Sequence, residues 1–386
     1  MKRLWALILL LPIALGKTYL VPIEGEIDPA LAVFVEQALA RAEREGASGV
    51  AFLIDTPGGR VDAAIRISDR ILQTPLPTLA QNRLNRLWRF LHHPTLQNPW
   101  ALTEALLPLL APRFPKDRPL PLIVDWTFAE DGRHQALVAA LPLKGRALVV
   151  AFALHPLPPF PSQNRVEEEF LHRLGRAVQD LGYTPLFLLD RGFDRVSLMR
   201  KLQGWGMGFL IRLRQNREVE PRGGKRLPLK EGYRRVVHPL REEVRLFGHG
   251  GEEVEVTLLV YPGGREPWYL AYSGPFGGKP PYGWRMWIEE GFRDLKGQGF
   301  GLDRHRLRTG ASLRGWLWLL ALGMALLILL GARLQGREWL PRLLAHPERQ
   351  SLFRLGRIAL AQGPPPWREA VVEELIRLLQ ELGGGK

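Results

Sequence analysis

The sequence predicts an α/β fold in two parts, and three observations carry that prediction. Strand-like and helix-like patterns alternate from Thr18 to Leu72. Near residue 80 the composition changes, and a segment rich in Arg, Leu and Trp begins. Further along, two apolar strand patterns each end in an aspartate. We therefore expect two α/β parts of different origin, with the candidate chemistry in the second.

Composition limits the classes of protein that need to be considered. A chain of 386 residues with 46% hydrophobic and 24% charged residues is globular and long enough for two or three domains. Its net charge of +14 predicts a polyanionic partner, nucleic acid first and an anionic membrane surface second. Acids outnumber bases in residues 17–80, so the excess positive charge lies downstream. The absence of Cys excludes disulfides, thiolate metal sites and Cys nucleophiles.

Residues 1–16 have the pattern of a secretory signal peptide. Lys2 and Arg3 precede the apolar stretch Leu4–Leu15, and Ala14-Leu15-Gly16 is a small-x-small cleavage site. This pattern predicts export.

Residues 17–80 predict a short β-α-β-α segment. Strands are expected at Thr18–Glu24 and Gly49–Ile54, and helices at Pro29–Gly46 and Val61–Leu72. The second strand runs into Asp55-Thr-Pro-Gly-Gly59.

This order resembles the start of the NfeD-type membrane serine proteases, which have the ClpP/crotonase fold. The resemblance implies that the backbone N–H groups of Gly58 and Gly59 face a tetrahedral oxyanion. It stops near Thr78-Leu79-Ala80, and the basic stretch 81–89 follows where the family supplies its nucleophilic Ser and later its Lys base. A Ser hydroxyl needs an adjacent base, so we expect a truncated segment without a catalytic dyad.

The second part, residues 81–386, predicts helix up to Phe114, then strands and helices in turn. Helices are expected at Gln163–Asp180, with Glu167 in its first turns, and at Tyr282–Lys296. The expected strands are Pro119–Val124, Ala147–Ala153, Thr184–Leu189, Phe209–Arg214, Val244–Phe247, Glu252–Tyr261 and Trp268–Ser273.

Three acids in this part are the candidate catalytic residues. Asp125 and Asp190 each end an apolar strand, and Glu289 lies on the later helix. This is the layout of an RNase H-like nuclease core, in which carboxylates hold two divalent metal ions. Taken singly, either aspartate is more often a turn former at a strand end.

The spacing around the third acid is more specific. Tyr282, Arg285, Glu289 and Lys296 are three, four and seven residues apart, so we expect them on one helical face. The pattern resembles the Y-x2-R-x3-E-x6-K signature of DDE transposases of the insertion sequence IS-four family, over about residues 81–340. The resemblance implies that Asp125, Asp190 and Glu289 bind two Mg²⁺ (or Mn²⁺) ions and catalyse the reaction.

Further residues acquire DNA-binding roles from this resemblance. Arg285 and Lys296 would hold phosphates, and Tyr282 and Arg191 would contact DNA nearby. Trp268 would stack on a flipped base, although a core Trp explains it equally well. The alternative for the basic residues is a solvated helix face with pairs such as Arg285 with Glu289.

The remaining segments carry weaker signals. Residues 205–280 match the β-rich insertion of this family, and the basic run Asp303–Arg308 is a candidate for phosphate contact. The uncharged run Gly315–Ala332 is long enough to span a membrane, but we expect a core helix. The tail, residues 335–386, is expected to be helical, with an amphipathic stretch at Trp367–Leu382.

The sequence as a whole predicts an export signal and a truncated NfeD-like start fused to a transposase domain. The expected function is cut-and-paste DNA transposition through a hairpin, on terminal and target DNA, by a homodimer. Because its N-terminus is replaced, an inactive protein is an equally acceptable expectation. The alternatives are an NfeD-like membrane serine protease remnant without its dyad and a non-catalytic basic DNA-binding protein. The function predicts a cytoplasmic or nucleoid location, which conflicts with the signal peptide; no other membrane association is expected.

Overall fold

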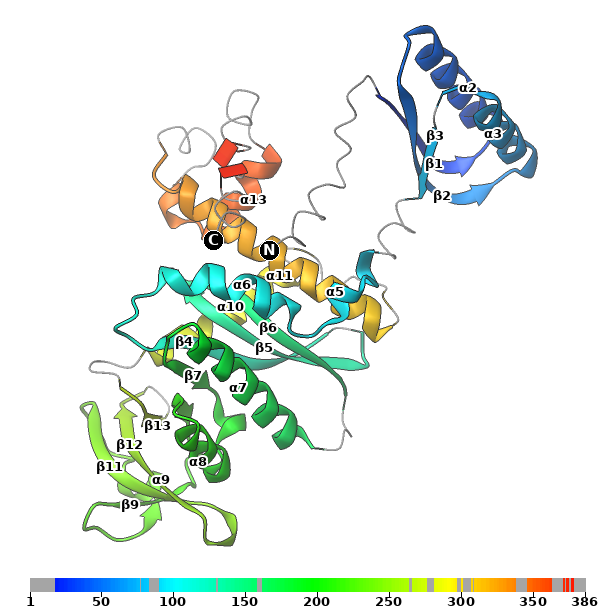
Figure 1. Ribbon diagram of the computed structural model, residues 1–386. Helices are drawn as coiled ribbons and strands as arrows, with labels where there is room; N and C mark the ends of the chain where they lie inside the picture. The colour runs from blue at the N-terminus through cyan, green and yellow to red at the C-terminus, as the bar shows by residue number, and fades with distance from the viewer. Residues whose placement is uncertain are drawn as a thin grey trace. The chain divides into compact units, whose positions relative to one another are not determined.

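The computed structural model divides the chain into two compact units, Met1–His93 and Pro94–Lys386 (Figure 1). It describes residues 18–76, 78–82, 90–129, 131–157, 162–263, 266–275, 281–296, 300, 307, 309–337, 346–362, 371, 373–374 and 376–377. The expected signal peptide, the run Asp303–Arg308 apart from Leu307, and most of Trp367–Leu382 lie outside these residues. Each unit is considered by itself.

The first unit is a parallel three-stranded sheet of order β1-β2-β3. Its elements are β1 (Thr18–Ile27), α2 (Pro29–Arg44), β2 (Gly49–Gly59), α3 (Val61–Gln73) and β3 (Thr78–Asn82). Helix α2 begins where Asp28 accepts a hydrogen bond from the Leu31 backbone N–H, with Pro29 at the first helical position. Val35, Leu39 and Phe52 are fully buried between the helices and the sheet. The β-α-β-α prediction is confirmed, and a third strand follows it.

The second unit contains one ten-stranded mixed sheet of order β10-β9-β11-β12-β13-β8-β7-β4-β5-β6. Its strands are β4 (Leu120–Phe128), β5 (His134–Leu143), β6 (Arg146–Pro156), β7 (Pro185–Leu189), β8 (Gly208–Arg212), β9 (Glu218–Pro221), β10 (Leu227–Pro228), β11 (Leu240–Phe247), β12 (Glu253–Tyr261) and β13 (Trp268–Ser273). Its helices include α5 (Pro94–Gln97), α6 (Ala101–Leu110), α7 (Gln163–Asp180), α8 (Val196–Gly204), α9 (Leu229–Gly232), α10 (Met286–Leu295), α11 (Gly310–Leu334) and α13 (Leu352–Gln362).

Strand directions define the centre of this sheet. β4 is parallel to β7 and β7 is parallel to β8, whereas β5 and β6 run antiparallel on the far side of β4. The strands of the β-rich stretch continue the same sheet through the antiparallel pair β8 and β13. The α/β prediction therefore holds for both units, and in the second the sheet is large and mixed.

Several local features differ from the prediction. Strands β5, β9 and β10 and helices α8 and α9 were not expected; β5 is a largely buried run rich in Ala, which carries no period-two alternation. The helix expected to begin at residue 81 is wrong there, because Gln81 and Asn82 pair with β2 in strand β3. The helix expected from Tyr282 to Lys296 consists of a 3₁₀ turn, η4 (Tyr282–Arg285), followed by α10.

Helix α11 contains the apolar run Gly315–Ala332 and lies against β6 and α13 (Figure 1). Glycines allow a close crossing with α13, since a Cβ on Gly331 would lie 1.9 Å from the Leu352 carbonyl oxygen and one on Gly356 2.0 Å from that of Leu327. In the described part of the chain, α11 is the one helix long and apolar enough to cross a membrane, and 61% of its most apolar window is buried. This burial supports a core helix.

Candidate functional site

The two strand-end aspartates of the second unit lie at the same edge of the sheet. β4 and β7 are parallel, and their last paired residues are Ile123 and Leu188. Asp125 and Asp190 each lie two residues further along, and parallel strands end at a common edge. The topology thus brings together two acids that are far apart in the sequence.

Asp125 is largely buried, with 18% of its side chain exposed. Its Oδ1 accepts a hydrogen bond from the Trp126 backbone N–H at 2.9 Å. Burial raises the pKa of Asp125 from 3.8 to about 6; the Arg285 charge opposes this increase, and the negative charges of Asp190 and Glu289 add to it. The three predicted acids therefore act on one another electrostatically.

Arg285 bridges two of the three acids. Its guanidinium donates to Asp125 Oδ2 at 2.9 Å and to Glu289 Oε1 at 2.8 Å. The 3₁₀ turn η4 positions this side chain, since Arg285 is its last residue and precedes α10. Glu289 lies in the first turn of α10, and 43% of its side chain is exposed. The site thus consists of two strand ends and one helix start arranged around the guanidinium of Arg285.

The prediction that Tyr282, Arg285, Glu289 and Lys296 share one helical face is wrong. The 3₁₀ turn changes the rotation per residue before α10, and Lys296 follows the end of α10 with non-helical backbone angles. Tyr282 is buried: its hydroxyl donates to the Leu189 carbonyl at 3.3 Å, and burial raises its pKa to about 12. Lys296 lines a small apolar pocket with residues such as Leu317.

The remaining predicted DNA contacts, Arg191 and Trp268, lie beside an acid, Glu266. Glu266 pairs with Arg191 and, at 2.8 Å, with Arg212. The Arg212 guanidinium lies 5.5 Å from the centre of the Trp268 ring, and Trp268 meets Tyr282 edge-on at 5.7 Å. Trp268 is half-buried, so part of its side chain packs in the protein and part is accessible. The hydrogen bond from Arg191 lowers the pKa of Glu266, and a phosphate would have to compete with this carboxylate.

The acids suit a hard divalent cation in kind, because carboxylate oxygens are the ligands that Mg²⁺ prefers. Their arrangement is not a preformed metal site: within the described residues, no three His, Asp or Glu side chains lie close enough to hold an ion. Arg285 lies between Asp125 and Glu289. A metal ion would therefore need Arg285 to leave at least one carboxylate.

One buried acid, Glu167 on α7, has no role in the sequence prediction. It is 1% exposed and accepts a 2.8 Å hydrogen bond from the indole N–H of Trp126, the residue after Asp125. The sequence signal was weak, because Glu167 precedes two further glutamates, and only the fold shows which of the three faces inward.

The predicted oxyanion glycines of the first unit have structural roles. The Gly58 backbone N–H donates to Thr56 Oγ1 at 3.1 Å, so this group is already engaged. Gly59 is paired with Ile27, and a Cβ at Gly59 would lie 2.2 Å from the Ile27 carbonyl oxygen. Close approach of two strands is a sufficient reason for glycine there.

Comparison with known proteins identifies the N-terminal part of the chain as NfeD-like. The model of the NfeD1b N-terminal domain family matches residues 17–84. Two solved structures, both described as mutants of the 1510-N membrane-bound stomatin-specific protease, are 31% identical to this chain with TM-scores of 0.17. The match covers 18% of this chain and 33% and 31% of those chains, so the chain spans about a third of their length. The second was determined with a substrate peptide. No curated protein matches.

These findings correct the family description given by the sequence analysis. They contradict the prediction of a transposase. With it, the predictions of DNA transposition, DNA recombination, a transposable element and an RNase H-like DDE core are contradicted as well. The family model supports instead an NfeD-like N-terminal part, residues 17–84. It also moves the end of the NfeD-like segment from residue 80 to residue 84, in agreement with strand β3.

Proposed function

We propose that residues 17–84 are the opening segment of an NfeD-like protease domain that has no peptidase activity in this chain. The family match supports the origin of the segment. The engaged N–H of Gly58 argues against a formed oxyanion site. The sequence also has no Lys between Lys17 and Lys116, where the resemblance requires a base after the nucleophile. The segment is thus a protease remnant without its dyad.

Peptide hydrolysis by the full chain, extracted in detergent, tests this proposal. We expect no turnover above that of buffer, and no difference between the natural chain and Gly58→Ala. Hydrolysis that disappears in Gly58→Ala would contradict the proposal, because it would show an operating oxyanion site.

A second candidate function belongs to the second unit. We propose that the acids around Arg285 form a divalent-cation-dependent site that cleaves or transfers phosphodiesters of nucleic acid. The observation that carries it is that Arg285 joins Asp125 to Glu289 while the charge of Asp190 acts on Asp125. Parallel pairing of β4 with β7 supports it, because it places Asp125 and Asp190 at the same edge of the sheet.

In this proposal the carboxylates bind the metal ions and Arg285 binds the substrate phosphate. Two Mg²⁺ (or Mn²⁺) ions would be held by Asp125, Asp190 and Glu289 and would supply charge neutralisation at phosphorus. Arg285 is paired with two carboxylates in this structure, and an incoming phosphate offers it an alternative bidentate partner. We propose that this exchange frees Asp125 and Glu289 for cation binding.

The other expectations for this unit remain proposals. DNA as the partner is supported by the net charge of +14, whose excess of basic residues lies downstream of residue 80. A homodimer and a cytoplasmic or nucleoid location follow from the same proposal.

A matched pair of variants tests the second function. Glu289→Gln removes an acid of the site, whereas Glu290→Gln removes its neighbour, which pairs with Arg293 and Arg146 outside the site. We expect Mg²⁺-dependent nicking of duplex DNA by the full chain to disappear in Glu289→Gln and to persist in Glu290→Gln. Equal activity in the two variants, or no nicking by the natural chain with Mg²⁺ or Mn²⁺, would refute the proposal.

A further inference from the structure

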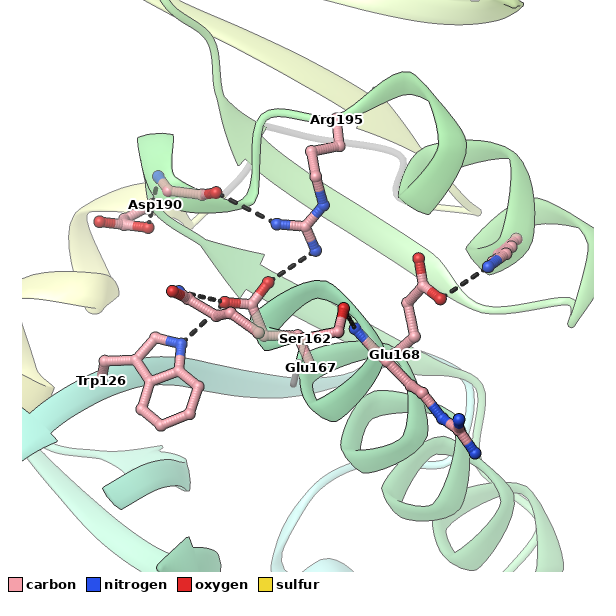
Figure 2. A network of polar contacts seen from close by, with 10 residues as sticks. Trp126, Ser162, Glu167, Glu168, Asp190 and Arg195 are labelled. Atoms are coloured by element: carbon pink, nitrogen blue, oxygen red, sulfur yellow. Dashed lines mark hydrogen bonds and ion pairs between the residues drawn. The ribbon is translucent and has the colours of Figure 1, made fainter. Parts of the chain in front are cut away.

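The buried carboxylate of Glu167 is the centre of a polar network beneath the acid site (Figure 2). Its Oε1 accepts hydrogen bonds from Trp126 Nε1 and Gln163 Nε2, both at 2.8 Å. Its Oε2 forms an ion pair with the Arg195 guanidinium at 2.6 Å. Ser162 caps the helix that carries Glu167, because its hydroxyl accepts from the Arg165 backbone N–H.

A fully buried ion pair contributes little net stability, because desolvation of both charges offsets their attraction. Glu167 is 1% exposed and the Arg195 side chain 17%. An apolar pair of similar volume would be about as stable at this place. The charged network instead fixes the orientation of its side chains, since each donor has to meet an oxygen at a fixed position.

The first branch of the network reaches Asp125 through the backbone. Successive side chains of a strand point to opposite faces of the sheet. Asp125 meets Arg285 of η4 on one face, and Trp126 reaches Glu167 of α7 on the other. Fixing the indole of Trp126 therefore fixes the adjacent peptide unit, whose N–H donates to Asp125 Oδ1.

The second branch reaches Asp190. Arg195 donates to the Gly192 carbonyl at 3.3 Å, and the Gly192 N–H donates to Asp190 Oδ1 at 2.8 Å. Figure 2 shows Arg195 between this turn and Glu167. One buried carboxylate is thus joined to both strand ends that carry the acids.

We propose that Glu167 is a positioning residue that sets the relative placement of Asp125 and Asp190 from the opposite face of the sheet. The proposal rests on the cation-dependent function proposed for the second unit. Glu167 touches neither the cation nor the substrate; it acts through Trp126 and Arg195. Its effect is therefore expected on cation affinity and on local order at the two strand ends.

The test compares Glu167→Gln with Glu168→Gln in the full chain. Gln at position 167 keeps the size of the side chain and loses the ion pair with Arg195. Glu168, its neighbour on α7, pairs with Lys201 at 2.6 Å and belongs to neither branch, so it is the matched control. Amide hydrogen exchange without metal and Tb³⁺ titration by sensitised luminescence are measured on both variants.

We expect the amides of Trp126 and Gly192 to exchange about tenfold faster in Glu167→Gln, the effect of weakening one charged contact. Tb³⁺ binding should weaken about tenfold in the same variant, with both readouts unchanged in Glu168→Gln. Trp126→Phe provides a second variant, since it removes the indole donor and keeps an aromatic ring and both charges of the Glu167–Arg195 pair. It should loosen the Asp125 strand end and leave the Asp190 turn protected.

The outcomes separate the two proposals. Unchanged exchange at both strand ends in Glu167→Gln overturns the positioning role, whatever the metal result. Faster exchange with unchanged Tb³⁺ affinity overturns it as well, because the acids would then not depend on Glu167. Faster exchange in a chain whose natural form binds no Tb³⁺ retains the positioning role and refutes the cation site.

Discussion

The two units of this chain place their charged side chains differently. In the first unit the ion pairs are exposed or partly exposed: Arg66 with Glu36 joins α3 to α2 with half of the Arg66 side chain exposed, and Arg70 with Glu43 keeps about a quarter of each side chain exposed. In the second unit Asp125 and Glu167 are directed inward and meet Arg285 and Arg195. Surface pairs contribute at most about 1 kcal/mol each, whereas buried charges are costly unless every group is paired. The comparison indicates that the second unit, unlike the first, maintains inward-facing acids at a cost in free energy.

The largest expected effect tests whether the two units are independent. Phe52 is fully buried in the first unit, so Phe52→Ala should lower the free energy of unfolding of that unit by about 4 kcal/mol. The second unit should be unaffected. Hydrogen exchange resolved by peptide measures both units in one sample.

Phe34→Ala is the control, because Phe34 is 45% exposed on α2 and should have a small effect. Loss of protection in the β4–β7 peptides of Phe52→Ala would show that the units fold together and would break the comparison.

The next effect concerns the inward-facing acid. The pKa of Asp125 is raised to about 6, so its protonated form is favoured in the folded chain. That contribution to stability is complete below about pH 4 and is lost as the pH rises through 6. The Asn side chain of the Asp125→Asn variant does not titrate. The free energy of unfolding of this variant should therefore increase relative to that of the natural chain by about 3 kcal/mol between pH 4 and pH 8.

Denaturant unfolding of the second unit at these two pH values measures the difference. Asp117→Asn, at an exposed position, should show no such trend. A constant gap between Asp125→Asn and the natural chain would mean that the acid site is not strained by its own charge.

The smallest effects concern the glycine pair of the first unit. Gly58 has φ of +117° and open space where a Cβ would lie, so Gly58→Ala should cost roughly 1 kcal/mol from backbone conformation alone. Gly59→Ala places a Cβ against the Ile27 backbone and should cost roughly 3 kcal/mol. Thermal unfolding of the first unit ranks the two variants, and the reverse order would contradict the strand-pairing explanation of Gly59.

Much of the fold could be predicted from local sequence patterns. The β-α-β-α order of the first unit follows from hydrophobic periodicity and from the Asp28-Pro29 start of α2. Strand β5 was missed because it is buried throughout and has no alternation to detect. The ends of α10 were missed because a 3₁₀ turn and an α-helix look alike in sequence spacing.

The candidate site was predictable in its residues and not in its contacts. Asp125, Asp190 and Glu289 were chosen from strand ends and spacing; in the structure Asp125 and Glu289 share Arg285, and the charge of Asp190 acts on Asp125. Their catalytic roles, and those of Arg191, Trp268, Tyr282, Arg285 and Lys296 toward DNA, stay predictions. The pairing of Arg285 with two acids and the burial of Tyr282 depend on how η4 packs against β4 and β7.

The sequence by itself determined the α/β class, the change of character near residue 80, the NfeD-like start and the identity of the three acids, because these depend on residue type and on short-range spacing. Only the tertiary structure decided that Glu167 lies inside while Glu168 pairs with Lys201 at 2.6 Å, and that the Gly58 N–H is engaged by Thr56. The physical reason is that burial and hydrogen bonding depend on which distant segments meet. Parallel pairing of β4 with β7 settles that question for the acid site.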